Sequence, residues 1–478
     1  MKRIAIIGGG ISGLSAAFTI EQHHRAGAPL EYVMYESTSR LGGVISTELD
    51  DKWVVETGPD SFLTEKPWAA DLCRELGLGD QLIGSNDDER KTYILVKGRL
   101  RPIPDGLIFM VPTRMLPTVF SRLFSPVTKL RMLREWFRQP HRPSKDESVA
   151  EFVERHYGTE LVDRLADPLL SGVYGGEASQ LSLRAVLPRF VEMEASHGSL
   201  GRAMVAARRK TVAKNSPRPL FTSLKSGMQQ MVDALAARLS PSSICMAAPV
   251  QQLVSEENGW MISASSGQEH FDSLIIATPA HGAAKLLQST APELANELRS
   301  IQYSSSVTLT MGYDSSVRSS LPPGFGFLVP RSEGKRLLAA TFVHNKFPNR
   351  APEDRALIRC FLGGSRDEEI LQLPEDEIIR IARQELREIL GLDAEPLFAR
   401  IYKWKAAMAQ YTVGHLDRLE RIDRLRQQIP GLALAGNAYR GIGVPDCVHS
   451  GMQATEQLLS YMGLTGSAPG LSAAGTKS

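Results

Sequence analysis

Six residues near the start of the chain have the types and spacing to bind a nucleotide. They follow the pattern G-x-G-x-x-G and are Gly8, Gly9, Gly10, Ile11, Ser12 and Gly13. Backbone amides at the junction of a strand and a helix can bind a pyrophosphate with the help of the helix dipole. Glu36 ends the next strand-like run, where its carboxylate can accept hydrogen bonds from a ribose. The segment therefore predicts a dinucleotide site.

Two further segments favour FAD over NAD as the dinucleotide. Arg40, Gly42 and Gly43 add a cation and two unshielded amides beside the same pyrophosphate, which a plain NAD site does not need. A second loop, from Glu56 to Phe62, lies at a distance along the chain that suits the isoalloxazine end. We therefore predict FAD, with further contacts from Ser37, Val44, Gly58, Pro59, Asp60 and Ser61.

The composition of the chain limits which other ligands and functions are possible. The chain has 478 residues and a formal net charge of +2, which gives no chain-wide attraction for nucleic acid. Four scattered cysteines form neither a metal-ligand pair nor a redox pair, so they favour a reducing cytosol and no metal. We expect Cys447 to be a packed thiol and the FAD to be non-covalent. No apolar run approaches the roughly 20 residues needed to cross a bilayer.

Strand and helix patterns alternate around these segments and predict an α/β fold, α+β overall. A strand–helix–strand unit from Arg3 to Tyr35 would hold the glycine loop. An amphipathic helix is predicted from Glu375 to Leu390, stopped by Gly391. The other predicted elements are a helix over Met228–Leu239, a hairpin over Tyr93–Leu100, and strands over Pro249–Val254, Gly259–Ala264, Ser273–Ala277, Ser306–Tyr313, Arg336–Val343 and Ala356–Leu362.

The stretch from Gly106 to Arg134 contains no acidic residue. Arg122, Lys129 and Arg131 stand there among Leu, Phe, Met and Val, a composition that suits an anionic membrane surface. A partly buried helical subdomain with a solvated basic rim would explain the same composition. A second acid-free stretch, Gly198 to Lys225, is less apolar and is predicted to be a mobile loop or helix end.

These patterns divide the chain into an FAD-binding Rossmann-type domain of separate segments, a mixed-sheet substrate domain and a helical membrane-associating subdomain. The FAD-binding domain is expected at 1–85 with 221–280 and 405–464. The substrate domain is expected at 86–100 with 281–404, and the helical subdomain at 101–220. The Gly/Ala/Ser-rich tail, 465–478, is predicted to be disordered.

At this point the residues resemble a known family. The glycine loop through Gly43 and the loop from Glu56 to Phe62 are similar to the flavin amine oxidase superfamily. Within it the chain resembles the porphyrinogen oxidases of haem biosynthesis, which act on protoporphyrinogen or coproporphyrinogen. The resemblance spans almost the whole chain and continues through Asp167–Gly176, Trp404–His415 and Ala435–Cys447.

The resemblance implies roles for further residues. Val250 should meet the adenine, Trp404 should lie beside the flavin, and Gly436 should belong to the cofactor site. Gly443, Val444 and Pro445 should pass close to the ribityl chain or the ring, and their composition also predicts a rigid turn that a ligand can approach. Substrate contacts are expected from Thr92, Tyr93, Ser171, Gly172, Tyr174 and Gly175, the last four in a loop.

Two departures from the family pattern are visible. Ala409-Gln410-Tyr411 stands where Pro-Gln-Tyr is common, which leaves the local backbone less constrained. Thr92 stands where some branches carry an Arg that would pair with a substrate propionate. The absence of that Arg makes the chain resemble the bacterial coproporphyrinogen-type branch.

The resemblance implies a six-electron oxidation of a porphyrinogen to the porphyrin, with dioxygen or another acceptor taking the electrons from FAD. Coproporphyrinogen III is favoured as substrate over protoporphyrinogen IX. The alternatives are a flavin amine oxidase, a carotenoid-type desaturase, and a non-enzymatic flavin-bound protein of a haem-related assembly. We expect a cytoplasmic protein that associates peripherally with an anionic membrane and with the neighbouring haem-pathway enzyme.

Overall fold

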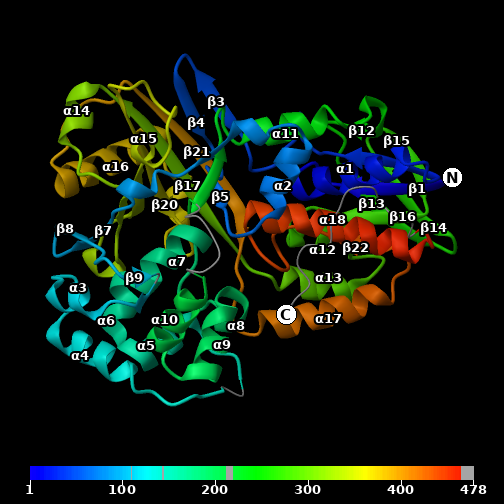
Figure 1. Cartoon of the computed structure of the whole chain (residues 1–478). Helices are drawn as coiled ribbons and strands as arrows, with labels where there is room; N and C mark the ends of the chain where they lie inside the picture. The colour runs from blue at the N-terminus through cyan, green and yellow to red at the C-terminus, as the bar shows by residue number, and fades with distance from the viewer. Residues whose placement is uncertain (109, 143–144, 212–218, 465–478) are drawn as a thin grey trace.

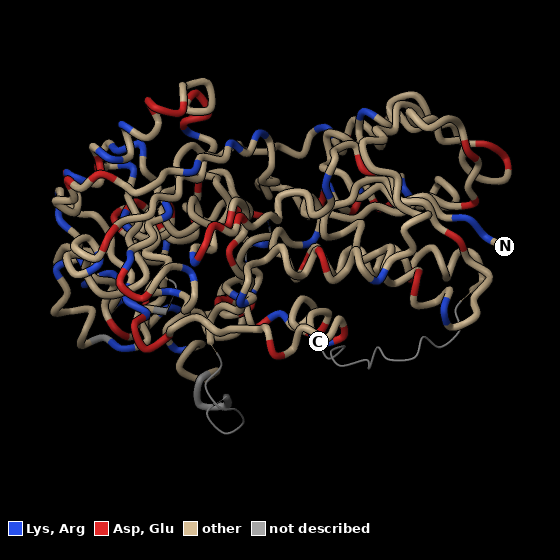
Figure 2. Tube along the Cα trace, turned by 90° about the horizontal axis from the view of Figure 1, so that it is seen from above, with Lys and Arg blue, Asp and Glu red and all other residues tan. Residues whose placement is uncertain are grey.

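The computed structural model describes residues 1–108, 110–142, 145–211 and 219–464. Three parts are visible in it (Figure 1): a parallel sheet with flanking helices, a mixed sheet, and a group of helices below the mixed sheet in this view. The predicted α/β fold class is confirmed. Basic and acidic residues are interspersed along the molecule (Figure 2), in keeping with the net charge of +2. The predicted disordered tail lies outside the described residues.

The first part is built on a five-stranded parallel sheet in the order β12-β2-β1-β16-β22. Strand β1 ends directly before Gly8 and helix α1 begins at Ile11, within the glycine motif, so the predicted strand–helix–strand unit is confirmed. The elements are β1 (Lys2–Ile7), α1 (Ile11–Arg25), β2 (Leu30–Tyr35), β12 (Ile244–Cys245), β16 (Ser273–Ile276) and β22 (Leu432–Leu434).

Helix α18 (Val444–Tyr461) packs against α1 and returns the C-terminal segment to the glycine loop (Figure 1). Gly451 permits this approach, because a Cβ there would lie 2.1 Å from the Ser12 carbonyl oxygen. The remaining elements around the sheet are α2 (Trp68–Glu75), α11 (Gln229–Ala236), β13 (Val250–Glu256), β14 (Gly259–Ala264), β15 (Gly267–Phe271), α12 (Ala280–Leu287), α13 (Pro292–Arg299) and α17 (His415–Gln427).

The second part is a seven-stranded mixed sheet in the order β21-β17-β20-β19-β18-β7-β8. The predicted hairpin is confirmed as β7 and β8, and it joins the sheet because β7 pairs in parallel with β18. The strands are β7 (Thr92–Val96), β8 (Arg99–Pro102), β17 (Tyr303–Tyr313), β18 (Gly326–Leu328), β19 (Leu337–Phe342), β20 (Ala356–Gly363) and β21 (Phe398–Ala409).

The two faces of this sheet differ because side chains alternate along each strand. One, here the apolar face, carries Leu309, Phe342 and Ile358 and is covered by α16 (Glu375–Leu390). The predicted helix is thereby confirmed, with Gly391 as its left-handed cap at φ 70°. The other, here the polar face, carries Thr308, Thr310 and Arg359 on β17 and β20, and Trp404 on β21. It is turned toward the loop that follows Glu56.

The third part is a group of helices around Phe152, Leu161 and Leu165, all fully buried. Helix α7 lies between this group and the mixed sheet, which it meets at β18 and β19. None of the described helices is both long enough and apolar enough to cross a membrane. The helices are α3 (Met115–Phe120), α4 (Pro126–Glu135), α5 (Val149–Tyr157), α7 (Asp167–Tyr174), α8 (Leu183–Val186), α9 (Pro188–His197) and α10 (Leu200–Thr211).

In the stretch from Gly198 to Lys225, predicted to be a mobile loop or helix end, residues 212–218 lie outside the described residues, and the described part contains helix α10 and strand β11 (Phe221–Leu224). The helix forms because Glu135 of α4 caps it: its carboxylate accepts hydrogen bonds from Leu200 N at 2.6 Å and Ser199 Oγ at 3.0 Å. Leu200 and Ala203 are buried on its inner side. These contacts come from distant segments, so the local composition did not reveal them.

Candidate active site

The glycine loop has the geometry of a phosphate-binding loop. Gly10 is the N-cap of α1, no side chain caps this end, and no acidic residue stands in the first turn, so the amides are free for a ligand. Open space lies on the side of Gly10 where a side chain would project, since a Cβ built on it would meet nothing within 4 Å. Gly13 serves packing, because a Cβ there would lie 1.9 Å from the Gly8 carbonyl oxygen.

Glu36 lies against this loop. Its Oε2 accepts a hydrogen bond from Gly9 N at 2.7 Å, and its Oε1 accepts from Thr38 N and Thr38 Oγ1 at 2.8 Å each. The side chain is buried, while the neighbouring Ser37 is exposed. Ser37 Oγ also donates to Oε1, at 3.3 Å, so Oε2, which has a single donor, is the oxygen that keeps an acceptor position for a ribose hydroxyl.

The segment from Arg40 to Val44 completes one side of the loop. Gly42 N donates to Gly9 O at 2.8 Å, and a Cβ on Gly43 would lie 3.3 Å from Gly10 Cα, so the two loops touch through backbone. Arg40 is exposed, and its guanidinium donates to the carbonyls of Gly43 and Ile45. In this state Arg40 orders its own loop rather than projecting away from it.

Val250 follows a segment that runs beside Glu36. Ala248 N donates to Glu36 O at 2.8 Å, and Ala247 N donates to Thr38 O at 2.8 Å. Val250, two residues further on, starts β13 and is half-buried. The predicted adenine residue, Val250, therefore lies two residues after the segment that is hydrogen-bonded to the predicted ribose residue, Glu36.

The loop after β4 (Trp53–Glu56) is held by the polar face of the mixed sheet. Thr57 O accepts hydrogen bonds from Trp404 Nε1 and Thr308 Oγ1 at 3.0 Å each and from Arg359 Nη2 at 3.3 Å. Arg359 also donates to Gly58 O. A Cβ on Gly58 would lie 1.8 Å from Val44 O, so this loop also presses on the segment that borders the glycine loop. Trp404 and the predicted flavin loop are thus brought together.

Asp60 is anchored by a lysine that sequence reasoning did not identify. Lys346 Nζ, at the end of α15 (Val343–Lys346), lies 3.0 Å and 3.1 Å from the two Asp60 carboxylate oxygens. Burial would raise the pKa of Asp60, but the charges of Lys346 and Arg359 outweigh it and hold this pKa well below its ordinary value. Asp60 is therefore ionised and serves to fix its loop; Ser61 donates to the same carboxylate at 2.6 Å.

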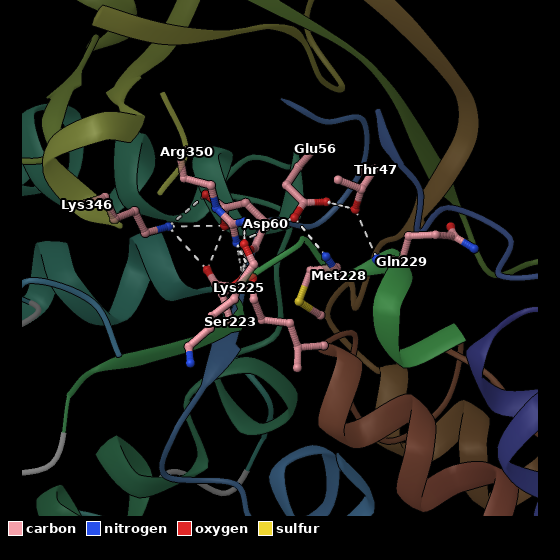
Figure 3. Close-up of polar contacts among 12 residues, drawn as sticks. Thr47, Glu56, Asp60, Ser223, Lys225, Met228, Gln229, Lys346 and Arg350 are labelled. Atoms are coloured by element: carbon pink, nitrogen blue, oxygen red, sulfur yellow. Dashed lines mark hydrogen bonds and ion pairs between the residues drawn. The ribbon is translucent and has the colours of Figure 1, made fainter. Parts of the chain in front are cut away.

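A second buried charge pair lies beside it, as Figure 3 shows. Arg350 Nη2 is 3.6 Å from Glu56 Oε1 and donates to Ser223 Oγ at 2.7 Å. Glu56 also accepts from Thr47 Oγ1 at 2.7 Å and from Met228 N at 2.8 Å. Burial raises the pKa of Glu56 to about 7, against the opposing charge of Arg350. The cluster joins β4 and the loop before β20 to β11 and to the start of α11.

The C-terminal segment supplies another helix end. Gly443 is the N-cap of α18, Val444 and Pro445 form its first turn, and Gly443 N donates to Asp446 Oδ2 at 3.2 Å. Lys66 Nζ pairs with the same carboxylate at 2.6 Å and 2.7 Å. Sequence reasoning missed this pair, although an acidic residue three positions after Gly443 is the spacing of a capping box.

Gly436 lies where β22 ends, with a φ of 133°, a conformation that side chains rarely adopt. Its amide donates to Ser450 Oγ at 3.1 Å, and the nearest atom to a built Cβ is Thr278 O at 3.8 Å. The loop after β22 is thereby fixed to α18 and leaves free space at Gly436.

The predicted substrate loop is wrong in its conformation: Ser171 to Tyr174 form the last turn of helix α7. The three glycines between Ser171 and Gly176 suggested a loop, but Pro168 in the first turn favours a helix. Only Gly175 is a turn residue, a left-handed cap with φ 60°. Gly172 and Val173 are exposed on α7, and a Cβ on Gly172 would lie 3.8 Å from Leu328 Cδ2 of the sheet.

Thr92 and Tyr93 point to opposite sides of the sheet. Thr92 pairs with Gly326 and lies on the polar face, which is the side of α7. Tyr93 packs with the apolar-face cluster, and its hydroxyl donates to Pro323 O at 2.9 Å. The two residues therefore do not line one common surface.

The donor set fits FAD. The glycine loop offers free amides at a helix start, Glu36 offers an acceptor beside it, and Trp404 is held against the loop that contains Thr57 and Gly58. A built Cβ at Gly10 meets only open space, as a site for a ligand requires. These are the features that a dinucleotide with a large planar ring needs.

Comparison with known proteins identifies this architecture. The family of flavin containing amine oxidoreductases matches residues 11–459. Coproporphyrinogen III oxidase of Bacillus subtilis (strain 168) is 31% identical over 470 residues, covering 96% of this chain and 98% of the relative. Protoporphyrinogen oxidase 2 of Arabidopsis thaliana, chloroplastic/mitochondrial, is 29% identical, with coverage of 96% and 94%.

Solved structures agree with this family. A protein from Exiguobacterium sp. 255-15 superimposes with a TM-score of 0.86 at 30% identity, covering 96% of this chain and 98% of the other. Reduced UDP-galactopyranose mutase superimposes with a TM-score of 0.70 at 16% identity, which shows the shared fold alone. The predicted family is confirmed, and FAD is the cofactor that it implies. This chain therefore belongs to the flavin containing amine oxidoreductases and, within them, is a member of the porphyrinogen oxidase family.

Proposed function

We propose that this chain oxidises coproporphyrinogen III to coproporphyrin III, with protoporphyrinogen IX as the competing substrate. The observation that carries the proposal is the end-to-end similarity to the Bacillus subtilis coproporphyrinogen III oxidase, 31% identical over 96% of this chain. The wall formed by α7 supports it, because Gly172, Val173 and Leu328 present small and apolar groups beside the polar face. Such a wall suits a flat macrocycle.

The cofactor would be held by the residues described above. We propose that the glycine loop binds the pyrophosphate, that Glu36 accepts from the ribose, and that Trp404 and the Thr57–Ser61 loop border the ring. Bound FAD supplies the two-electron acceptor, with dioxygen as the final acceptor.

The reaction requires little acid–base catalysis by side chains of the protein. Removing hydride from a saturated bridge of a porphyrinogen leaves a cation that the adjoining pyrroles delocalise, and three such two-electron steps with loss of protons give the porphyrin. The contribution of the chain is orientation and exclusion of water. Thr92, in place of a cation, leaves the substrate carboxylates to water at the rim, since a buried unpaired carboxylate costs several kcal/mol.

Anaerobic mixing of the holoenzyme with each reduced porphyrinogen tests the proposal. Bleaching of the flavin absorption and appearance of porphyrin fluorescence are the expected results. Bleaching by an amine or a carotenoid precursor, but by neither porphyrinogen, would contradict it. A tenfold preference in kcat/KM for protoporphyrinogen IX, about 1.4 kcal/mol, would refute the choice of coproporphyrinogen III alone.

We also propose that α3 and α4 lie on an anionic membrane surface. Phe120 is 81% exposed, Leu116 72%, Phe137 78% and Val127 62%, an unusual set of apolar side chains for an open surface. Arg122 and Arg131 are exposed and Lys129 half-buried among them. The opposite side of the same segment packs inward through Leu123, Phe124 and Met132. One amphipathic segment therefore accounts for both a buried side and a lipid-facing side.

Flotation with vesicles that contain anionic lipid tests this docking. Replacing Arg122, Lys129 and Arg131 by Gln should weaken binding and its salt dependence, because headgroup charges are screened within about 8 Å at physiological ionic strength. Phe120→Ser with Phe137→Ser should weaken binding at all salt concentrations. Exposed Arg400, on the mixed sheet, offers a control for loss of charge alone. Flotation equal to that of wild type for both sets would refute the proposal.

A further inference from the structure

Two adjacent residues, Gln410 and Tyr411, lie where the three parts of the molecule meet. They follow directly on β21, and both are buried, with 6% and 2% exposure. Gln410 N donates to Gln302 O at 2.9 Å, which keeps the pair extended after the strand ends. Successive side chains of extended backbone point to opposite sides, so the two can act on different partners.

The Gln410 side chain acts on α7. Its amide Nε2 donates to Tyr174 O at 2.6 Å, to Ser304 Oγ at 2.9 Å and to Met408 O at 3.1 Å. Tyr174 is the last residue of α7, and Ser304 stands on β17. A Cβ on Gly176 would lie 2.0 Å from Gln410 Oε1, so this amide occupies the space that the glycine leaves. Gln410 therefore fixes the end of the substrate wall against the mixed sheet.

The Tyr411 hydroxyl acts on another partner, the loop between β22 and α18, while the ring also lies near that of Tyr174, with centroids 6.3 Å apart. Its hydroxyl donates to Asn437 O at 2.9 Å and accepts from Gly441 N at 2.7 Å. The ring is stacked on His415, with centroids 4.0 Å apart and planes 12° apart. Asn437 and Gly441 flank the segment that leads to Gly443. Tyr411 therefore fixes the loop assigned to the flavin.

The backbone of the same dipeptide is anchored independently of these side chains. Ser182 N donates to Tyr411 O at 2.7 Å, and Val413 N donates to Gln180 O at 3.0 Å. These bonds join the strand end to the helical group just beyond α7. A change in either side chain leaves them in place, so variants can test position without removing the connection.

We propose that Gln410 and Tyr411 form a positioning pair that sets the separation between the α7 wall and the flavin loop. Gln410 governs how the substrate is placed, and Tyr411 governs how tightly FAD is held. The inference rests on the proposed function for its substrate half alone. Neither residue is a catalytic residue; each acts through the carbonyl or amide that it binds. The pair thereby assigns a role to a motif whose first residue, Ala409, departs from the family pattern.

The test compares Gln410→Leu with Tyr411→Phe. Loss of the tyrosine hydroxyl should raise the Kd for FAD about fivefold to thirtyfold, as expected for one or two hydrogen bonds, with KM for porphyrinogen unchanged at saturating FAD. Loss of the amide should raise KM about tenfold and leave the Kd for FAD unchanged. Ser304→Ala is the matched partner of Gln410, and the double variant should be less than additive.

Two measurements test this proposal without an assay of catalytic turnover. Flavin fluorescence gives the Kd for FAD, and amide hydrogen exchange reports opening of residues 171–178, which should quicken in Gln410→Leu and not in Tyr411→Phe. If FAD affinity, KM and hydrogen exchange changed equally in both variants, the proposal would be refuted, and Gln410 and Tyr411 would have a structural role only. Wild-type protein inactive on every porphyrinogen would refute the proposed function, while FAD affinity and exchange would still decide this inference.

Discussion

The apolar face and the polar face of the mixed sheet are made by alternate residues of the same strands, yet they contact different parts of the molecule. Val307, Leu309 and Met311 of β17 are fully buried against the cluster that α16 covers. Thr308, between them, instead donates from its Oγ1 to the carbonyl of Thr57. The apolar face secures the sheet, and the polar face secures the loop assigned to the flavin. Stability and cofactor binding should therefore respond separately to substitutions one residue apart.

The largest effect is expected on the apolar face. Leu309→Ala should lower the free energy of unfolding by about 3 to 4 kcal/mol, because the side chain is 0% exposed and the cavity cannot collapse in a covered sheet. The Kd for FAD of the folded fraction should stay within twofold of wild type. Urea unfolding and flavin titration measure the two quantities. If FAD affinity fell together with stability in this variant, the expectation that the two faces of the sheet act separately would be contradicted.

The next largest effect is expected from protonation of His344 in α15. His344 accepts from Leu357 N at 3.1 Å, and burial lowers its pKa to about 4. Because this folded-state value lies below the ordinary 6.5, the unfolded chain binds more protons between the two values. The stability contributed by neutral His344 is complete above pH 6.5 and is lost as the pH falls toward 4.

The corresponding measurement is the unfolding free energy of wild type and His344→Gln above pH 6.5 and again near pH 4. The slope with pH should be shallower in the variant, and the change attributable to His344 should not exceed about 3 kcal/mol. The charge of Arg318 in α14 (Ser315–Ser320) also lowers this pKa. A variant that neutralises Arg318 should therefore raise the pH at which the stability contributed by His344 is lost. Superimposable pH profiles would contradict the assignment.

Whether the sequence predicted a feature correctly depends on how far apart along the chain the interacting residues are. The helix from Glu375 to Leu390 was predicted with its observed bounds, because its periodicity and Gly391 are local signals. The glycine loop and Trp404 were found through a family pattern. Lys346, Arg350 and Arg359 were missed, because a charged residue looks like a surface residue in the sequence, and only the fold brings Asp60 and Glu56 from a distant segment against it. The α7 turn was misread because Gly172 resembles a loop residue.

On the polar face the largest change in cofactor affinity is expected from Arg359→Met. The guanidinium is 3% exposed and donates to Thr57 O and Gly58 O, so its loss should weaken FAD binding by about 2 kcal/mol, some thirtyfold. Stability should fall less than in Leu309→Ala, because burial disfavours the charged guanidinium. Arg400→Met is the matched control: its pairs with Glu48 and Asp50, at 3.6 Å each, are exposed and should contribute little.

The smallest and sharpest comparison lies within one strand, because Thr308 and Thr310 occupy the same face two residues apart. Thr308 Oγ1 donates to Thr57 O at 3.0 Å, whereas Thr310 Oγ1 is buried without a hydrogen-bond partner among the described residues. Valine keeps the shape and removes the hydroxyl in both. Thr308→Val should weaken FAD binding by about 1 kcal/mol, roughly fivefold.

Thr310→Val should leave FAD binding unchanged and should hold or raise the unfolding free energy, since it removes a polar group that burial penalises. Titration of both apoproteins with FAD, with thermal unfolding of each, measures the difference directly. Equal effects from the two variants would mean that the hydroxyl bond to Thr57 does not reach the flavin. The polar face would then be a second structural face, and Trp404 and Arg359 alone would connect the sheet to the cofactor loop.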